Sequence, residues 1–362
     1  MVRSQRVWAA RFVTSSELHA SVPAHPERTE RPLRILYVTS EWPDEEFPYT
    51  SPFITDQVEF LRRAGVEVDV FAFRGRRNPL NYLKAWMQVR HGLDPSRYDL
   101  VHTSHGQAGL LPWPRRLPVV ATFWGSDILG DRYPDGRMRP GGRFLQRACW
   151  LIALVADGVI IVSNAMRQHL PASVEPLLLP TAVDLDSVPT ISPQAARRSL
   201  GLPKDERLVL FAGNPETIEK RYDLASAAVE ILNERLPARL FLGWGRSHQE
   251  ILVLMRACDV LLVSSLQEGS PTIVKEALAC KLPVVSVPVG DVDEQIGGVE
   301  GCELCGDDRP ETIAAALERV LRRRQRLTGN HVAHVDHKVL ADRLIAFYRS
   351  VLDEVPRDVV NG

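Results

Sequence analysis

The residues best suited to chemistry lie between a predicted strand and a predicted helix in the second half of the chain. The apolar run 260–264 favours a buried strand that ends at Ser264, and Ser270-Pro271 is typical of a helix start. Gly269 lets the backbone approach a ligand closely, because no Cβ intervenes. The unpaired N–H groups at the start of this helix suit a phosphate.

Two glutamates flank the same turn. Glu268 precedes it, and Glu276 lies in the second turn of the predicted helix. Carboxylates accept hydrogen bonds, so a pair beside an anion site suits the hydroxyls of a sugar. The alternative is that both are solvated charges at a helix end. The strand–loop–helix setting favours the ligand interpretation.

A candidate cation follows the first strand of the second half. Gly213 comes directly after the predicted strand 208–212, and Lys220 and Arg221 come just before the predicted helix 224–233. A flexible ammonium supplies a compact positive charge for a diphosphate. The alternative reading, an ordinary solvated helix start, stays open.

Three residues in the first half follow predicted strands and are candidates for acceptor or sugar contacts. Trp124 can stack on a sugar face and donate through its indole N–H, but it cannot act as an acid or base. His105 follows the preceding strand, where a lone histidine is more often structural. Asp127 is predicted either to contact a hydroxyl or to cap a helix.

Strands alternate with helices along the chain, which predicts an α/β fold with mainly parallel, doubly wound sheets. The proline-rich tract 180–193 is predicted to be a hinge. We therefore expect an N-terminal Rossmann-like domain over 32–185 and a second one over 194–335. Residues 336–362 are expected to form a helix that packs back on the first domain, and 1–31 a disordered extension.

Bulk composition excludes several classes. Lys+Arg is 44 and Asp+Glu is 45, so the overall charge does not favour nucleic acid as a partner. No run approaches 18 uninterrupted apolar residues, so a membrane span is not expected. Five cysteines, an odd number, fit a reducing cytoplasm better than a disulfide framework. No Asp-x-Asp motif stands out at a strand end, so we expect no metal and no cofactor.

The paired glutamates and their surroundings resemble family 4 (group 1) retaining glycosyltransferases. The flanking segments 257–262 and 281–285 match the same family, and the resemblance covers residues 33–350. It implies the GT-B fold, in which two Rossmann-like domains face a central cleft. It also implies a nucleotide-sugar co-substrate and no obligatory metal.

The resemblance also assigns roles to the candidate residues. Glu276 would bind the ribose of the nucleotide, and Glu268 the hydroxyls of the transferred sugar. The backbone of Gly269–Thr272 would meet the sugar and phosphates, while Gly213, Lys220 and Arg221 resemble the phosphate-binding turn. Lys220 and Glu268 are the residues expected to act in catalysis, because charge builds on the leaving diphosphate.

Two positions depart from the family pattern. Asn214 stands where many members carry an arginine, and Trp124 where the family commonly has a histidine. We therefore expect retaining transfer of a hexose-type sugar from a UDP- or GDP-sugar to a small-molecule or lipid-linked glycan acceptor. Two alternatives remain: a catalytically impaired partner protein that binds sugar nucleotides, and a GT-B nucleotide-sugar epimerase.

A basic, partly aromatic stretch from Arg74 to Arg90 lies early in the first domain. In related enzymes this domain binds the acceptor, sometimes at a membrane surface. A basic amphipathic helix supports peripheral association with the inner face of the membrane. The alternative is a plain solvated face, since arginine is abundant throughout the chain.

Overall fold

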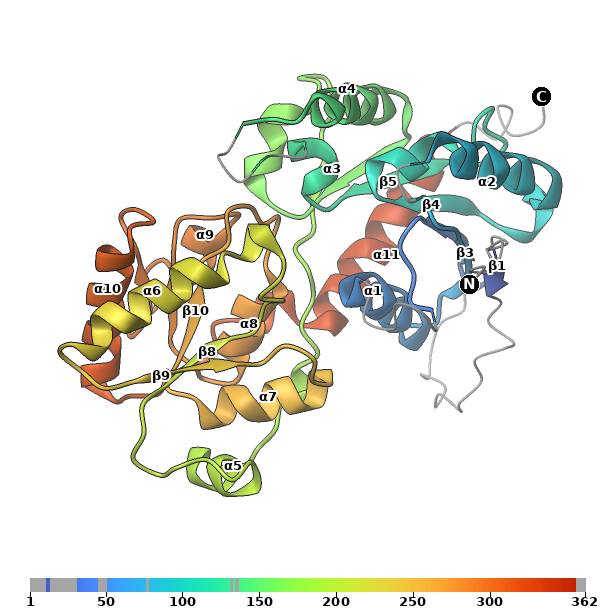
Figure 1. Ribbon diagram of the computed structural model, residues 1–362. Helices are drawn as coiled ribbons and strands as arrows, with labels where there is room; N and C mark the ends of the chain where they lie inside the picture. The colour runs from blue at the N-terminus through green and yellow to red at the C-terminus, as the bar shows by residue number, and fades with distance from the viewer. Residues whose placement is uncertain are drawn as a thin grey trace, which may run out of the picture. The chain divides into compact units, whose positions relative to one another are not determined.

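The computed structural model describes residues 11–13, 31–44, 51–75, 78–130, 133 and 137–355 (Figure 1). These residues form two compact units. Unit 1 holds the described residues up to Gly130, those from Met138 to Ala182 and those from His337 onward. Unit 2 holds those from Val183 to Asp336, together with Tyr133 and Arg137. Each unit is an α/β structure built on a mainly parallel sheet, so the predicted fold class is confirmed.

Unit 1 is built on a sheet with the strand order β1-β3-β2-β4-β5-β6-β7. All pairs are parallel except β1 with β3. β4 and β5 are buried along their whole length, as expected for strands covered on both faces. The strands are β1 (Arg11–Val13), β2 (Arg34–Thr39), β3 (Glu67–Ala72), β4 (Leu100–Ser104), β5 (Val119–Phe123), β6 (Gly158–Ile161) and β7 (Leu177–Leu178).

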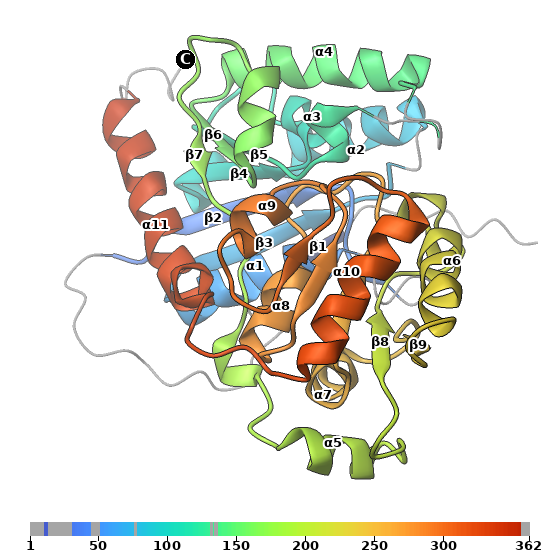
Figure 2. The ribbon, with the colours of Figure 1, turned by 90° about the vertical axis from the view of Figure 1, so that its left-hand side faces the viewer.

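Helices cover both faces of this sheet (Figures 1 and 2). The chain moves one way from β2 to β3 and the other way from β3 to β4, so right-handed crossovers place successive helices on opposite faces. One face carries α1 (Pro52–Arg63) and α11 (His337–Glu354), which pack on each other. The other carries α2 (Pro79–Gly92), the 3₁₀ helix η3 (Gly106–Leu110), α3 (Ser126–Leu129) and α4 (Pro140–Val155).

The C-terminal helix α11 is fastened to the sheet of unit 1 by a buried polar contact. Nδ1 of His102 lies 2.5 Å from the Tyr348 hydroxyl, and Nε2 lies 2.7 Å from Oγ1 of Thr122. Burial lowers the pKa of His102 to about 3, so the ring is neutral at ordinary pH. A Cβ at Gly158 would come within 2.8 Å of Val351, so the backbone of β6 lies directly against the helix.

One expectation for unit 1 differs in part from the structure. Within the predicted disordered extension, residues 11–13 form β1, which pairs with β3; the rest of 1–31, apart from Arg31, lies outside the described residues. Without β1, the outer edge of β3 would carry unpaired backbone N–H and C=O groups. Residues 11–13 include Phe and Val, which favour strands, so this segment can pair with that edge. Ser51 adopts a left-handed conformation and donates its hydroxyl to Glu41, and its side chain does not cap the helix.

Unit 2 has an all-parallel sheet with the order β12-β11-β10-β8-β9. Its strands are β8 (Leu208–Phe211), β9 (Arg239–Leu242), β10 (Val260–Val263), β11 (Val284–Ser286) and β12 (Glu303–Leu304). Its helices are α5 (Pro193–Ser199), α6 (Tyr222–Asn233), α7 (His248–Ala257), α8 (Thr272–Ala279), α9 (Val292–Ile296) and α10 (Pro310–Arg323). α10 packs on α6, and α5 packs on α7.

The strand order fixes where a ligand is expected. In unit 2 the chain reverses direction between β8 and β10, and in unit 1 between β2 and β4. Loops diverge at the carboxyl ends of such neighbouring strands, which is where open α/β sheets bind ligands. Among the described residues, no helix is long and apolar enough to cross a bilayer.

Candidate active site

Lys220 and Glu268 meet at the reversal point of unit 2. Lys220 ends the 3₁₀ helix η6 (Ile218–Lys220) after β8, and Glu268 follows β10. Nζ of Lys220 lies 2.6 Å from Oε1 of Glu268. The lysine side chain is 36% exposed and the glutamate 16%, so the pair stands at the surface of the unit.

Backbone contacts hold these two loops together. The Leu266 N–H donates to the Glu219 carbonyl at 2.8 Å, and the Ser264 hydroxyl donates to the Lys220 carbonyl at 3.0 Å. Gly213 adds a close approach, because a Cβ there would lie 3.2 Å from Cγ of Lys220. The glycine therefore leaves room for the lysine side chain, in addition to the predicted approach of a phosphate.

The start of α8 has no side-chain cap. Pro271 occupies the N-cap position, and the helix begins at Thr272. Ser270, the other residue of the predicted helix start, turns inward and donates to Oδ2 of Asp291 at 2.7 Å. The first N–H groups of α8 thus depend on partners outside the helix, which suits an anion.

The buried residue Lys275 stabilises this turn through a hydrogen bond. Nζ of Lys275 lies 2.5 Å from the Ser270 hydroxyl, and the side-chain amide of Gln295 donates to Oδ1 of Asp291. Burial lowers the pKa of Lys275 to about 8, although the negative charge of Asp291 opposes the shift. Burial raises the pKa of Asp291. The network links Ser270 in the β10–α8 loop to α8 and to the segment after β11.

A second glycine sets the spacing of those loops. Gly290 has φ +60°, and a Cβ there would lie 2.9 Å from the Gly269 carbonyl oxygen and 3.2 Å from that of Glu268. Any other residue would push the Glu268–Gly269 backbone away. The glycine at 290, which sequence reasoning did not single out, keeps the two turns in contact.

Glu276 faces the opposite end of the site, toward the start of α7. Its Oε1 lies 2.8 Å from Nε2 of His248, and its side chain is largely buried. Trp244, just after β9, is half exposed, and Gly245 beside it has a positive φ. The turn after β9 and the start of α7 therefore lie against the carboxylate expected to bind ribose.

Two other polar residues of this turn, the predicted phosphate ligand Arg221 and the family departure Asn214, are directed elsewhere. Arg221 adopts a left-handed conformation, and its guanidinium pairs with Asp308 at 2.7 Å. Asn214 accepts the Glu216 N–H at 3.0 Å and so closes a local turn around Pro215. Lys220 is therefore the cation that this turn directs toward Glu268.

In unit 1, the carboxylate of Asp127 holds two loops together. Its carboxylate accepts backbone N–H groups from two loops, and its side chain is almost fully buried. The donors are the N–H groups of Gly106, Trp124, Gly125 and Ile128, at 2.9–3.2 Å. The residue joins the loops after β4 and β5, and in this conformation its oxygens serve the backbone.

Trp124 is also committed to protein contacts. Its indole N–H donates to the Ser104 hydroxyl at 2.8 Å, and its ring centroid lies 4.6 Å from that of Phe53. The residue is 9% exposed, so little of the ring face is open for stacking on a sugar.

His105 is the strained member of the unit 1 set. It has φ 72°, a conformation that costs a non-glycine residue energy and is common at functional sites. Its Nδ1 is buried without a hydrogen-bond partner, and Nε2 lies 3.8 Å from Oε2 of Glu41, which follows β2. Glu41 was missed by sequence reasoning, although it follows a strand at the same sheet edge.

Two family models match the chain. The model described as Glycosyltransferase Family 4 matches residues 34–187, and that described as Glycosyl transferases group 1 matches residues 204–323. Together the two models span most of the chain, and each covers most of one doubly wound unit. The chain therefore belongs to the family 4, group 1 glycosyltransferases, and its fold is GT-B.

Particular relatives and structures agree with this class. The chain is 28% identical to D-inositol 3-phosphate glycosyltransferase of Geodermatophilus obscurus over 314 residues, 72% of this chain and 68% of the relative. Sucrose-phosphate synthase from Thermosynechococcus elongatus aligns with a TM-score of 0.75 and 17% identity, over 89% of this chain and 100% of that chain. HepE from Anabaena, in complex with UDP, aligns with a TM-score of 0.58 and 16% identity, over 89% and 99%.

Proposed function

We propose that the protein transfers a hexose-type sugar from a UDP- or GDP-sugar to a small-molecule or lipid-linked glycan acceptor, with retention of the anomeric configuration. The observation that carries the proposal is the Lys220–Glu268 pair at the reversal point of unit 2, beside the uncapped start of α8. A positive group, free N–H dipoles and a carboxylate are what a sugar diphosphate requires.

The diphosphate is the group on which negative charge grows during transfer. One N–H of the Lys220 ammonium faces Glu268, which leaves two donors for phosphate oxygens. The N–H groups at the start of α8 supply the second contact. With these groups in place we propose that no metal ion is required, and that Glu276 accepts hydrogen bonds from ribose.

Retention follows from a front-face transfer in this proposal. The acceptor hydroxyl attacks the anomeric carbon of the sugar from the same side as the leaving diphosphate. The bond between that carbon and the diphosphate breaks, and a donor phosphate oxygen takes the proton of the hydroxyl. Trp124 cannot serve as a nucleophile or a base, and Asp127 is occupied by backbone N–H groups. These contacts support a mechanism that needs no protein nucleophile on unit 1.

The acceptor class rests on the relatives and on the chemistry of the site. The relative from Geodermatophilus is named for D-inositol 3-phosphate, a small polar acceptor. Nucleotide sugars and free cysteines both suit the cytoplasm, where we place the protein. A lipid-linked acceptor would bring it to the inner face of the membrane.

Calorimetric titration with UDP and with GDP tests the proposal first, and release of UDP or GDP from a panel of nucleotide sugars tests turnover. Lys220→Ala should lower turnover about 100-fold by removing charge stabilisation. Glu276→Ala should weaken nucleotide affinity. Glu230→Ala, at an exposed position of α6, should leave it unchanged. A chelator should have no effect.

Absence of binding to both nucleotides would reject the proposal. Binding without turnover on any acceptor preparation would instead favour the alternative of an impaired sugar-nucleotide-binding partner.

A further inference from the structure

α4 is apolar on its exposed side as well as on its buried side. Cys149, Ile152 and Ala153 face the sheet and are almost fully buried. The opposite side carries an exposed stripe at helical spacing, formed by Phe144, Arg147, Leu151 and Leu154. Phe144 is 75% exposed and Leu151 57%. A surface helix normally presents polar residues to water, so this stripe indicates a partner.

The same layer continues into α2 and η3, on the same face of the unit 1 sheet. In α2 the exposed side carries Leu80, Leu83 and Met87, at positions i, i+3 and i+7. Leu110 at the end of η3, which packs on α4, is also exposed. Among the described residues, most large hydrophobic side chains that are exposed belong to α2, η3 and α4. We call this surface the α2–α4 face.

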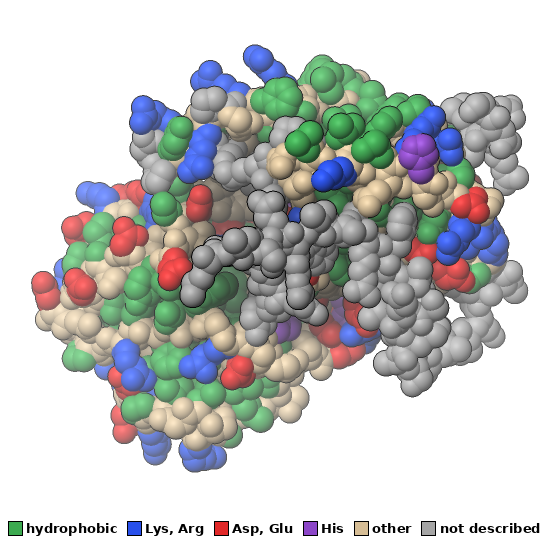
Figure 3. Space-filling model, turned by 45° about the vertical axis from the view of Figure 1, so that its right-hand side comes forward, with side chains coloured by type: hydrophobic (Ala, Val, Ile, Leu, Met, Phe, Trp, Pro, Cys, Tyr) green, Lys and Arg blue, Asp and Glu red, His purple; other side chains and the backbone are tan. Residues whose placement is uncertain are grey.

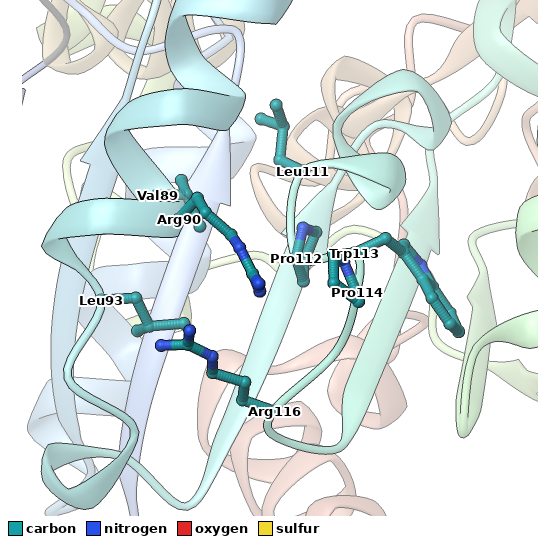
Figure 4. Close-up of a pocket in the computed structure, with 8 residues that line it drawn as sticks. All are labelled: Val89, Arg90, Leu93, Leu111, Pro112, Trp113, Pro114 and Arg116. Atoms are coloured by element: carbon teal, nitrogen blue, oxygen red, sulfur yellow. The ribbon is translucent and has the colours of Figure 1, made fainter. Parts of the chain in front are cut away.

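The segment that follows η3 fills the space beside α2. A small pocket there is lined by Val89, Arg90 and Leu93 of the α2 side and by residues 111–114 and Arg116 (Figure 4). The indole N–H of Trp86 donates to the Trp113 carbonyl. α2, this segment and η3 are thus one packed layer, and η3 joins it to α4.

The charge of this layer has a single sign. Residues 79–93, 106–118 and 138–156 contain no aspartate or glutamate. Their basic residues are Lys84, Arg90, Arg115, Arg116, Arg139, Arg143 and Arg147, of which Arg115 pairs with Asp157 just after α4. Of these, Arg143 and Arg147 are exposed on α4 itself, next to its apolar stripe. Figure 3 shows hydrophobic and basic side chains interleaved over α2 and α4.

We propose that the α2–α4 face docks on an anionic lipid bilayer, with Phe144, Leu151 and the α2 leucines entering the headgroup–acyl boundary. Apolar side chains mixed with Lys and Arg match a surface that is apolar inside and negatively charged outside. A second copy of the chain fits poorly, because its own face would bring the same positive charge and no acidic partner.

This proposal names the surface that would hold the enzyme near a lipid-linked acceptor. It extends the proposed function in that respect, but the docking itself depends only on unit 1. The nucleotide site lies in unit 2, so the two can be tested separately.

Co-sedimentation with large unilamellar vesicles tests the docking directly. The full chain should bind vesicles of phosphatidylcholine with about 30% phosphatidylglycerol at least about 10-fold more tightly than phosphatidylcholine alone. Binding should weaken as salt is raised, because salt screens the basic residues. The double variant Phe144→Glu/Leu151→Glu should lower the partition coefficient about 100-fold. Arg143→Glu/Arg147→Glu should lower it by at least about fivefold for each residue.

Matched controls lie away from the α2–α4 face. Val339→Glu changes an exposed apolar residue of α11, on the other face of the same sheet, and Arg198→Glu changes an exposed arginine of α5. Both should bind vesicles as the parent does. Thermal unfolding and UDP affinity of the Phe144→Glu/Leu151→Glu variant should match the parent, which separates lost docking from lost folding.

Three outcomes would overturn the proposal. The first is a parent chain that binds neither kind of vesicle, and the second is a Phe144→Glu/Leu151→Glu variant that binds as well as the parent. A parent dimer that this variant converts to a monomer, without vesicle binding, would assign the face to a second copy. Failure of UDP and GDP to bind would reject the proposed function while leaving the vesicle result intact.

Discussion

The two units place their candidate residues at equivalent positions but use them differently. The unit 2 pair follows β8 and β10, where the sheet reverses direction, and the unit 1 set follows β4, at the corresponding reversal, and the next strand β5. In unit 2, titratable side chains contact one another near the surface, as Lys220 does with Glu268 and His248 with Glu276. In unit 1, Asp127 and Trp124 are buried and serve the backbone and a neighbouring hydroxyl.

This difference separates a ligand site from a scaffold. A partly exposed ion pair can exchange one partner for a phosphate or a hydroxyl at low cost, because water already screens it. A buried carboxylate with four N–H donors cannot exchange them without leaving those donors unpaired. Position at a sheet edge therefore does not by itself make a residue a ligand contact. The contacts that its side chain already makes decide whether it is available to a ligand.

The largest effect concerns the buried support beneath the unit 2 site. The pKa of Lys275 is lowered to about 8 in the folded protein, so between pH 8 and 10.5 the unfolded chain binds more protons than the folded one. The free energy of unfolding should therefore rise with pH in this window. We expect the difference between the parent and Lys275→Met to grow by about 3 kcal/mol in favour of the parent.

Denaturant unfolding at a series of pH values measures this difference, because groups that do not interact with Lys275 titrate alike in both proteins and cancel. A difference that stays flat would show that Asp291 keeps Lys275 charged. Lys275 and Asp291 would then form a buried ion pair in which both side chains keep their charge.

Local pattern predicted the elements well because each depends on its own residues. The apolar run before Glu268 gave β10, and the proline at 271 preceded α8 as expected. The α/β alternation predicted two doubly wound units, which is confirmed. The short elements α9 and β12 were missed, since two to five residues carry little periodic signal.

Long-range partners were beyond local pattern. Lys220 and Glu268 were both singled out, but they lie 48 positions apart, and nothing in the local pattern indicates that they pair with each other. Ser270 looked like a helix cap, and its inward turn depends on Lys275 and on Asp291, which comes from another loop. The predicted roles of these residues in binding and catalysis remain predictions.

The next effect tests the scaffold interpretation of unit 1. Asp127→Ala leaves the N–H groups of two loops without their acceptor, so the free energy of unfolding should fall by about 2 kcal/mol. UDP affinity should be unchanged, because the proposed nucleotide contacts lie in unit 2. Thermal or denaturant unfolding and calorimetry measure the two quantities, with exposed Asp205→Ala as control. Unchanged stability with lost turnover would make Asp127 a ligand contact instead.

The smallest effect concerns the indole of Trp124. Trp124→Phe keeps the ring near Phe53 but removes the N–H that donates to Ser104, so unfolding should cost about 1 kcal/mol less. In a double-mutant cycle with Ser104→Ala, the coupling energy should also be about 1 kcal/mol. Zero coupling, together with a turnover loss of tenfold or more in Trp124→Phe, would mean that the indole serves a substrate. Unit 1 would then share the ligand-contacting character of unit 2, and the contrast between the two units would fail at this residue.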